Sequence, residues 1–136
     1  MARKMIRHVE PTEHQIQSAI VEWANITSCG YCYRKIGHYL FSIPNGGLRC
    51  IKTAKRLKKE GLKSGVSDLF LAFPSWDWRG IKNKHGLFIE VKSTNGKISL
   101  LQKEFMKRMD EVKYHTVIVK SVDEGIQAIK DYLGME

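Results

Sequence analysis

Two short stretches decide the fold: Gly65-Val-Ser-Asp68-Leu-Phe-Leu71 and, after a polar linker, Leu87-Phe-Ile-Glu90-Val-Lys92. Both are rich in aliphatic and aromatic residues, which is typical of β-strands. We expect strands over residues 66–73 and 87–93, joined as a long hairpin. Because side chains alternate along a strand, Glu90 and Lys92 should lie on one face, opposite Ile89 and Val91.

Charged side chains within such apolar strands are costly unless they are paired or bind a metal. If the two strands pair, Asp68 and Glu90 lie near each other. Two carboxylates, with waters and a substrate phosphate, suit Mg²⁺, which rarely uses a cage made only of protein. A plainer interpretation is a Glu90–Lys92 ion pair with Asp68 in a turn. All three residues together favour a catalytic metal site.

The flanking sequence predicts an α/β domain with a central mixed β-sheet flanked by helices. Thr12 with Gln15, and Ser99 with Gln102, form capping-box patterns that should each begin a helix. The first of these helices should end near residues 28–30. The other elements are expected at 39–43 (strand), 48–60 (helix), 116–119 (strand) and 122–133 (helix). The helix after Ser99 should bury four residues, Leu101, Phe105, Met109 and Val112.

The chain of 136 residues is the length of one domain, with residues 1–10 as a basic tail and 11–136 as the folded unit. No run approaches the roughly 20 apolar residues of a membrane span, and no secretory signal is visible. Three cysteines argue against a disulfide framework and fit a reducing, cytoplasmic location. For Cys29 and Cys32 we expect buried thiols, with structural zinc as the less favoured alternative.

Basic residues outnumber acidic ones by 23 to 14, a formal charge of +9, which indicates a polyanionic partner, nucleic acid first. The excess is concentrated in the helix expected at 48–60. One side of that helix should pack through Cys50, Ile51, Ala54 and Leu57. The other side should neutralise DNA phosphates, through Arg49, Lys52, Lys55, Arg56 and Lys59. Asn45 and the two following glycines either bring backbone amides to a phosphate or form a plain turn.

Six segments together resemble one family: Thr12–Gln17, Asn45-Gly46-Gly47, Gly65–Asp68, Glu90-Val-Lys92, Leu100-Leu-Gln102 and the final strand–helix unit. They resemble the VRR-NUC family of the PD-(D/E)XK superfamily, whose nuclease module also occurs in the Fanconi-associated nuclease. The resemblance spans residues 11–133, with Ser67 at the proline position of the superfamily motif. It implies a restriction-endonuclease-like core, dependence on Mg²⁺ or Mn²⁺ and cleavage of DNA phosphodiesters. It also implies a small phage-type homodimer, in the host cytoplasm, that acts on branched DNA such as Holliday junctions.

The resemblance implies that Asp68, Glu90 and a first-helix glutamate hold the metal, with the Val91 carbonyl as a further ligand. Lys92 would then assist the nucleophile. Helical geometry favours Glu13 over Glu22, because Glu13 falls within the arc of the apolar positions. A first-turn acid is also favoured by the helix dipole alone. For Gln102, helix capping and contact with the active site both remain open.

The rival interpretation is a non-catalytic nucleic-acid-binding module with the same fold. The complete Asp68, Glu90 and Lys92 set argues against it. Trp76 and Trp78 either pack on the surface or stack on unpaired bases. Together with Tyr31 and Tyr33, they are surplus aromatic residues of the kind found in dimer interfaces. The sequence has no Walker loop or dinucleotide fingerprint, so we expect no nucleotide cofactor.

Overall fold

The computed structural model describes residues 9–30, 33–44, 51–76 and 83–136. Its elements, in chain order, are α1 (Glu13–Ile26), the 3₁₀ turn η1 (Ile36–His38), β1 (Leu40–Ser42), α2 (Ile51–Lys59), β2 (Leu69–Leu71), β3 (Leu87–Val91), α3 (Leu100–Glu111), β4 (His115–Val119) and α4 (Val122–Leu133). Apart from η1, this is the predicted order of helices and strands.

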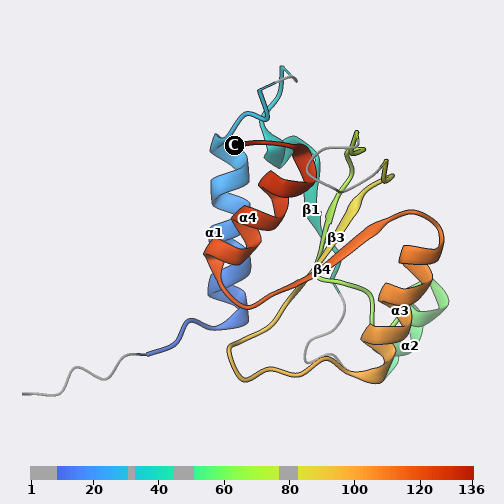
Figure 1. The fold of residues 1–136 in the computed structure, drawn as a ribbon. Helices are drawn as coiled ribbons and strands as arrows, with labels where there is room; N and C mark the ends of the chain where they lie inside the picture. Colours follow the sequence, from blue (N-terminus) through green and yellow to red (C-terminus); the bar gives the residue numbers. More distant parts are fainter. Residues whose placement is uncertain (1–8, 31–32, 45–50, 77–82) are drawn as a thin grey trace, which may run out of the picture.

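The four strands form one mixed sheet in the order β1-β2-β3-β4. β1, β2 and β3 are antiparallel neighbours, and β4 runs parallel to β3. α1 and α4 lie on one face of the sheet, and α3 lies on the other (Figure 1). The predicted α/β fold with a central mixed sheet is therefore confirmed.

The core lies between the sheet and the α1–α4 pair. Ile16, Ile20 and Ala24 recur at helical spacing along α1 and are buried. They pack with Leu69 and Ile89 of the sheet and with the inner face of α4. Gly125 belongs to the same contact, because a Cβ there would lie 2.3 Å from the Cδ1 of Ile20. This close approach fixes α1 and α4 on the sheet.

Helix ends follow the predicted local rules. Both capping boxes form, with Thr12 and Gln15 at α1 and with Ser99 and Gln102 at α3. α4 ends at Gly134, which adopts a left-handed conformation (φ 69°) as a helix-stopping glycine does. No helix among the described residues is long and apolar enough to cross a membrane.

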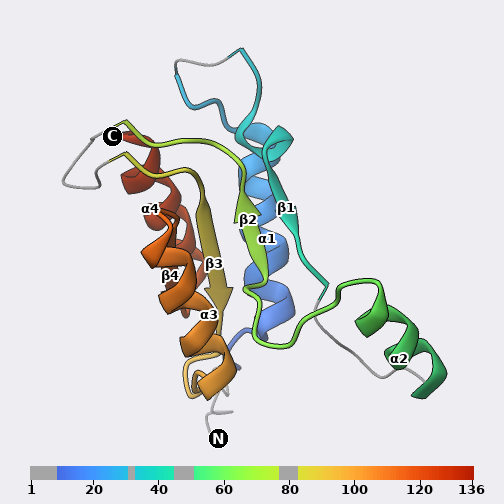
Figure 2. The same cartoon turned by 90° about the vertical axis from the view of Figure 1, so that its right-hand side faces the viewer.

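Three packing predictions are wrong. In α3, Phe105 is buried, but Leu101 and Val112 are exposed, because α3 lies over only part of the sheet. In α2 no residue is buried and Ile51 is 76% exposed, since the helix projects away from the sheet (Figure 2). Its predicted apolar side therefore has no core to face; Cys50 lies outside the described residues.

β1 (predicted at 39–43), β2 and β3 are shorter than predicted, whereas β4 begins one residue earlier than predicted, at His115. The second strand spans residues 69–71 rather than 66–73, and the third ends at Val91 rather than Ser93. At this end of the hairpin the N–H of Val91 is bound by the Asp68 side chain, where a longer β2 would offer its backbone.

Cys29 is buried, but it is disulfide-bonded rather than a free thiol. An odd number of cysteines leaves one unpaired and does not prevent one pair, so the count alone was a poor guide. A disulfide sulfur is not the thiolate that zinc requires.

Candidate active site

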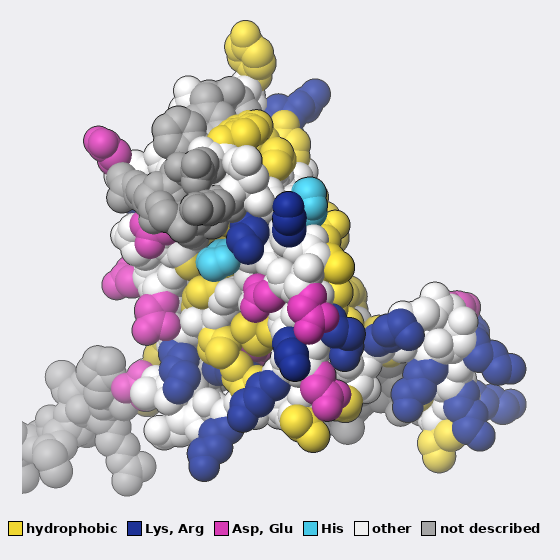
Figure 3. All heavy atoms as spheres, turned by 45° about the vertical axis from the view of Figure 1, so that its right-hand side comes forward, with side chains coloured by type: hydrophobic (Ala, Val, Ile, Leu, Met, Phe, Trp, Pro, Cys, Tyr) yellow, Lys and Arg dark blue, Asp and Glu magenta, His cyan; other side chains and the backbone are white. Residues whose placement is uncertain are grey.

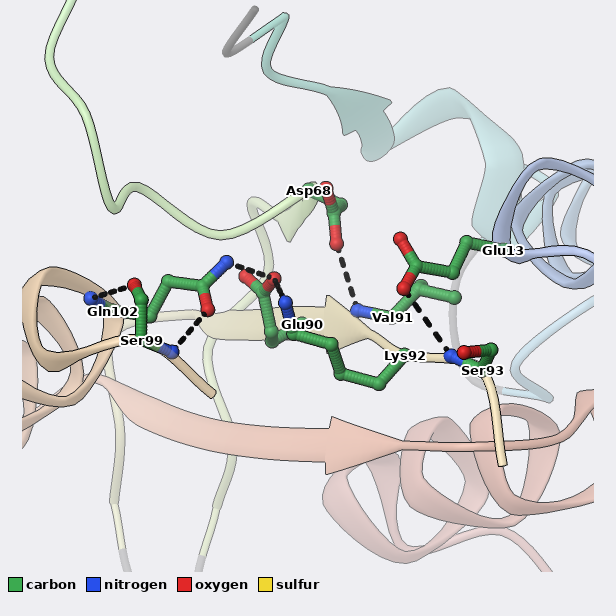
Figure 4. A network of polar contacts seen from close by, with 8 residues as sticks. All are labelled: Glu13, Asp68, Glu90, Val91, Lys92, Ser93, Ser99 and Gln102. Atoms are coloured by element: carbon green, nitrogen blue, oxygen red, sulfur yellow. Dashed lines mark hydrogen bonds and ion pairs between the residues drawn. The ribbon is translucent and has the colours of Figure 1, made fainter. Parts of the chain in front are cut away.

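The site lies where β3 ends, beside the first turns of α1 and α3 (Figure 4). All five residues of β3 are buried, and one of them, Glu90, is a carboxylate with 2% of its surface exposed. Its Oε1 accepts a hydrogen bond of 2.7 Å from Gln102 Nε2 and lies 3.7 Å from Lys92 Nζ. Its Oε2 is buried without a hydrogen-bond partner in the described part of the chain. While Glu90 is ionised this oxygen has no donor among the described residues, whereas a protonated Glu90 can donate a hydrogen bond to Asp68.

Asp68 lies beside this carboxylate, directly before β2. Its Oδ2 accepts a hydrogen bond of 2.8 Å from the backbone N–H of Val91, which fixes the side chain across the end of the hairpin. The antiparallel pairing of β2 with β3 brings the two predicted acids together from positions 22 residues apart.

Both carboxylates resist ionisation. Burial, and next the charge of Asp68, raise the pKa of Glu90 from 4.5 to about 7, while Lys92 opposes the shift. The pKa of Asp68 is also raised, mainly by burial and further by the charge of Glu13; the hydrogen bond from Val91 and the charge of Lys92 act in the opposite direction. Two acids that cannot easily both be charged either keep a proton on one of them or are neutralised by a bound cation.

The structure brings Glu13, and not Glu22, to this site. Glu13 lies in the first turn of α1, and its Oε1 accepts a hydrogen bond of 3.3 Å from the N–H of Ser93. Its side chain points toward Asp68 and Val91 in Figure 4, although it is exposed rather than buried. Glu22 lines a groove against Leu40 and Ser42 of β1 instead.

Gln102 combines the two roles that the sequence left open. Its Oε1 accepts the N–H of Ser99 at 2.9 Å in the α3 capping box. Its Nε2 donates to Glu90 in the same conformation. A capping box therefore supplies a hydrogen bond to the candidate site.

Sequence reasoning gave no role at the site to three supporting positions. Ser93 contributes its backbone N–H to Glu13, and Ser99 orients Gln102. Gly65 has φ +87°, and a Cβ there would lie 2.6 Å from the carbonyl oxygen of Leu101, so the segment leading to Asp68 packs tightly on α3. The glycine three residues before Asp68 was the available signal. Ser67 is buried, and its hydroxyl has no hydrogen-bond partner among the described residues.

The predicted phosphate-binding residues of α2 are exposed. They form the basic lobe at the right of Figure 3, where Lys and Arg side chains cover the projecting helix. The described members are Lys52, Lys55, Arg56 and Lys59, joined by Lys58. Arg56 forms an exposed ion pair of 3.7 Å with Glu60. Asn45 and Arg49 lie outside the described residues.

The residues fit a hard divalent cation. Among the described residues, no three His, Cys, Asp or Glu side chains are grouped closely enough to hold a metal by themselves. Mg²⁺ does not need such a group, because it commonly uses one or two carboxylates with waters and substrate phosphate. The unsatisfied Oε2 of Glu90, beside Asp68, is the kind of oxygen such an ion takes.

Comparison with known proteins agrees with this geometry. The sequence model of the VRR-NUC domain matches residues 11–123. The chain belongs to the VRR-NUC family. A solved structure described as a VRR_NUC domain protein shares 25% identity with this VRR-NUC chain, with 93% of each chain covered and a TM-score of 0.75. No curated protein matches. The family identifies the chain as a nuclease-type domain, and the VRR-NUC family predicted from the sequence is confirmed.

Proposed function

We propose that this VRR-NUC chain is a metal-dependent endonuclease that hydrolyses DNA phosphodiester bonds. The observation that carries the proposal is Glu90, a buried carboxylate with one unsatisfied oxygen, next to Asp68 and Lys92. A protein that only bound DNA would gain nothing from two adjacent carboxylates, because they repel phosphate.

Mg²⁺ or Mn²⁺, when bound, would lower the pKa of a coordinated water and neutralise charge on the phosphate. Asp68 and Glu90 would hold the ion, with Glu13 at the exposed rim and the Val91 carbonyl as a further ligand. The hydrogen bond from Val91 N–H to Asp68 keeps that carboxylate in position before any ligand arrives.

Lys92 would act on the attacking water and the phosphate, and Gln102 would act on Glu90. The Lys92 ammonium lies 3.7 Å from Glu90 and its side chain is 13% exposed, so it reaches the site with little competing water. We assign it to orienting the attacking water and stabilising charge on the phosphate as the phosphorus–oxygen bond breaks. Gln102 would hold Glu90 in one rotamer through its amide.

For the substrate and assembly, we propose branched DNA, such as a Holliday junction, cut by a homodimer. One catalytic centre cuts one strand, and a two-fold dimer supplies two centres of matching polarity. The exposed α2 cations support contact with DNA phosphates. Tyr33, an exposed aromatic residue, supports a further contact surface.

The test is cleavage of supercoiled plasmid and of a four-way junction with Mg²⁺, Mn²⁺ or EDTA. We expect metal-dependent cutting that EDTA stops and that Asp68→Asn lacks. Tight DNA binding with no cleavage under any metal condition would contradict the proposal and favour a non-catalytic binding module.

The homodimer is tested separately by sedimentation equilibrium at micromolar concentration, with and without junction DNA. A protein that stays monomeric in both conditions would rule out paired cutting and leave a single-strand nicking activity.

A further inference from the structure

A row of aromatic side chains crosses the sheet beside the candidate active site. Phe41 pairs with Phe70 in the β1–β2 register, and Phe70 pairs with Phe88 in the β2–β3 register. The ring centroids of Phe41 and Phe70 are 5.6 Å apart, and those of Phe70 and Phe88 are 4.5 Å apart. The three rings form one continuous surface.

This aromatic row lies on the same sheet face as Glu90. Phe88 packs against Phe105 of α3, with ring centroids 5.1 Å apart, and Glu90 is bonded to Gln102 of the same helix. Phe88 precedes Glu90 by two residues, so their strand positions are about 7 Å apart. The buried end of the row therefore lies close to Glu90 on that face of β3.

The row passes from a buried end to an exposed one. Phe88 is 9% exposed beneath α3, whereas Phe41 is 51% exposed. Figure 2 looks at this face: α3 lies in front of β4, and β1 and β2 are open to view. Phe70 is held in between, because a Cβ on Gly86 would lie 2.6 Å from its ring. Phe41 thus rests on a tightly packed support while presenting half its surface to solvent.

We propose that Phe41, backed by Phe70, stacks against an unpaired nucleobase of the strand that is cut. This inference rests on the proposed nuclease function and narrows its substrate to branched DNA in which a nucleotide beside the scissile phosphate is unpaired at the branch point. A nucleobase is the occupant because the aromatic surface adjoins the centre that holds the phosphate, and a base is attached to each phosphate through its sugar. The basic α2 projects beyond this same open side of the sheet and suits the continuing backbone (Figure 2).

The test measures binding in EDTA, where no cleavage occurs, with the full chain. The probes are a DNA duplex carrying one unpaired 2-aminopurine and a fully paired duplex of the same sequence. Fluorescence of 2-aminopurine falls when the base stacks on an aromatic ring. The variants are Phe41→Leu, which keeps an apolar side chain without a ring, and Phe41→Trp, which keeps an aromatic ring. Trp76→Leu is the matched control, since it removes another exposed aromatic residue after the far end of β2.

We expect Phe41→Leu to weaken binding of the unpaired probe by about fivefold or more and to abolish the quenching. Binding of the paired duplex should change by less than about twofold, because phosphate contacts remain. Phe41→Trp and Trp76→Leu should retain the quenching.

Equal affinity of Phe41→Leu and wild type for the unpaired probe would overturn the inference. A shift of Phe41→Leu from dimer to monomer, with no change in base quenching, would overturn it as well and assign the surface to a second copy of the chain. These readouts need no catalysis, so they test base stacking independently of cleavage. Absence of cleavage in the wild type would contradict the proposed function and would not change the outcome of the stacking test.

Discussion

The side-chain amide of Gln102 joins the N-terminal cap of α3 to the carboxylate of Glu90. Its oxygen accepts the Ser99 N–H at 2.9 Å, and its nitrogen donates to Glu90 Oε1 at 2.7 Å (Figure 4). Because the cap occupies the amide oxygen, the NH₂ group can only face Glu90. A residue of the α3 capping box therefore also orients a candidate metal ligand.

This relationship predicts a selective effect of Gln102→Glu. A glutamate preserves the capping box, so α3 should still form. It replaces the donor to Glu90 by a second carboxyl group, which raises the pKa of Glu90 further. We expect cleavage at neutral pH to fall about tenfold or more and the pH–rate profile to move to higher pH.

Gln15→Glu is the matched control, because it makes the same change in the capping box of α1, where Gln15 is exposed. Its cleavage rate should equal that of wild type. Equal loss in both variants would show that Gln102 acts through helix capping alone.

Loss of the Asp68 or the Glu90 carboxylate should abolish DNA cleavage and leave DNA binding intact. We expect Asp68→Asn and Glu90→Gln each to lower the cleavage rate by about a hundredfold or more, measured on plasmid with Mg²⁺. Their affinity for DNA in EDTA should match or exceed that of wild type, because a repulsive charge is gone.

The two glutamates of α1 give an internal comparison for the same assay. Glu13→Gln should slow cleavage more than Glu22→Gln, since only Glu13 lies beside Asp68. The opposite order would exclude Glu13 as the helix ligand.

The raised pKa of Glu90 predicts how the metal-free protein responds to pH. Between about pH 4.5 and 7 the unfolded chain ionises this group before the folded one does. The free energy of unfolding should therefore fall as pH rises through that range, by a contribution on the order of 3 kcal/mol at most. Urea unfolding in EDTA across pH 5–8 measures it.

Glu90→Gln is the reference for that experiment, because it lacks the titrating group and should show a flatter profile. His115, whose pKa is lowered mainly by burial, contributes in the opposite direction but is present in both proteins. Parallel pH profiles of the two proteins would show that Glu90 does not cause the fall in the free energy of unfolding.

Reversing charges on α2 should act on DNA affinity without unfolding the protein. Lys52→Glu, Arg56→Glu and Lys59→Glu together should weaken binding to all DNA sequences and reduce the slope of log affinity against log salt. The melting temperature should stay close to that of wild type, because no α2 residue is buried.

Three reversals in segments outside α2, Lys35→Glu, Lys113→Glu and Lys120→Glu, provide a control of equal net charge. If both triple variants lose the same affinity, the effect is one of total charge and α2 has no special part in binding.

Short stretches of the sequence predicted the helix starts and the pairing of β2 with β3. The capping boxes at Thr12 and Ser99, and the adjacency of Asp68 and Glu90, follow from helix-end chemistry and strand pairing. Exposure of Ile51 and Leu101 was not predictable, because it depends on which faces of the sheet are covered. Periodicity shows that a helix has an apolar side and does not show whether anything packs on it.

The candidate site, too, was predicted only in part from the sequence. Residue types and spacing indicated Asp68, Glu90 and Lys92, while the double role of Gln102 required the distance from α3 to β3. The disulfide of Cys29 was missed because its formation depends on the spatial approach of two sulfurs, which the cysteine count does not contain.

Because α2 projects away from the sheet, the charge on its surface is separated from the stability of the fold. Where a helix both contacts a ligand and packs on the core, a substitution that changes affinity also changes stability. Here the basic helix buries none of its residues, and the core is completed by α1, α4 and the sheet. Substitutions of the exposed charges on α2 can therefore accumulate while the melting behaviour of the domain stays the same, and if α2 contacts DNA as proposed, they can tune that contact independently of the fold.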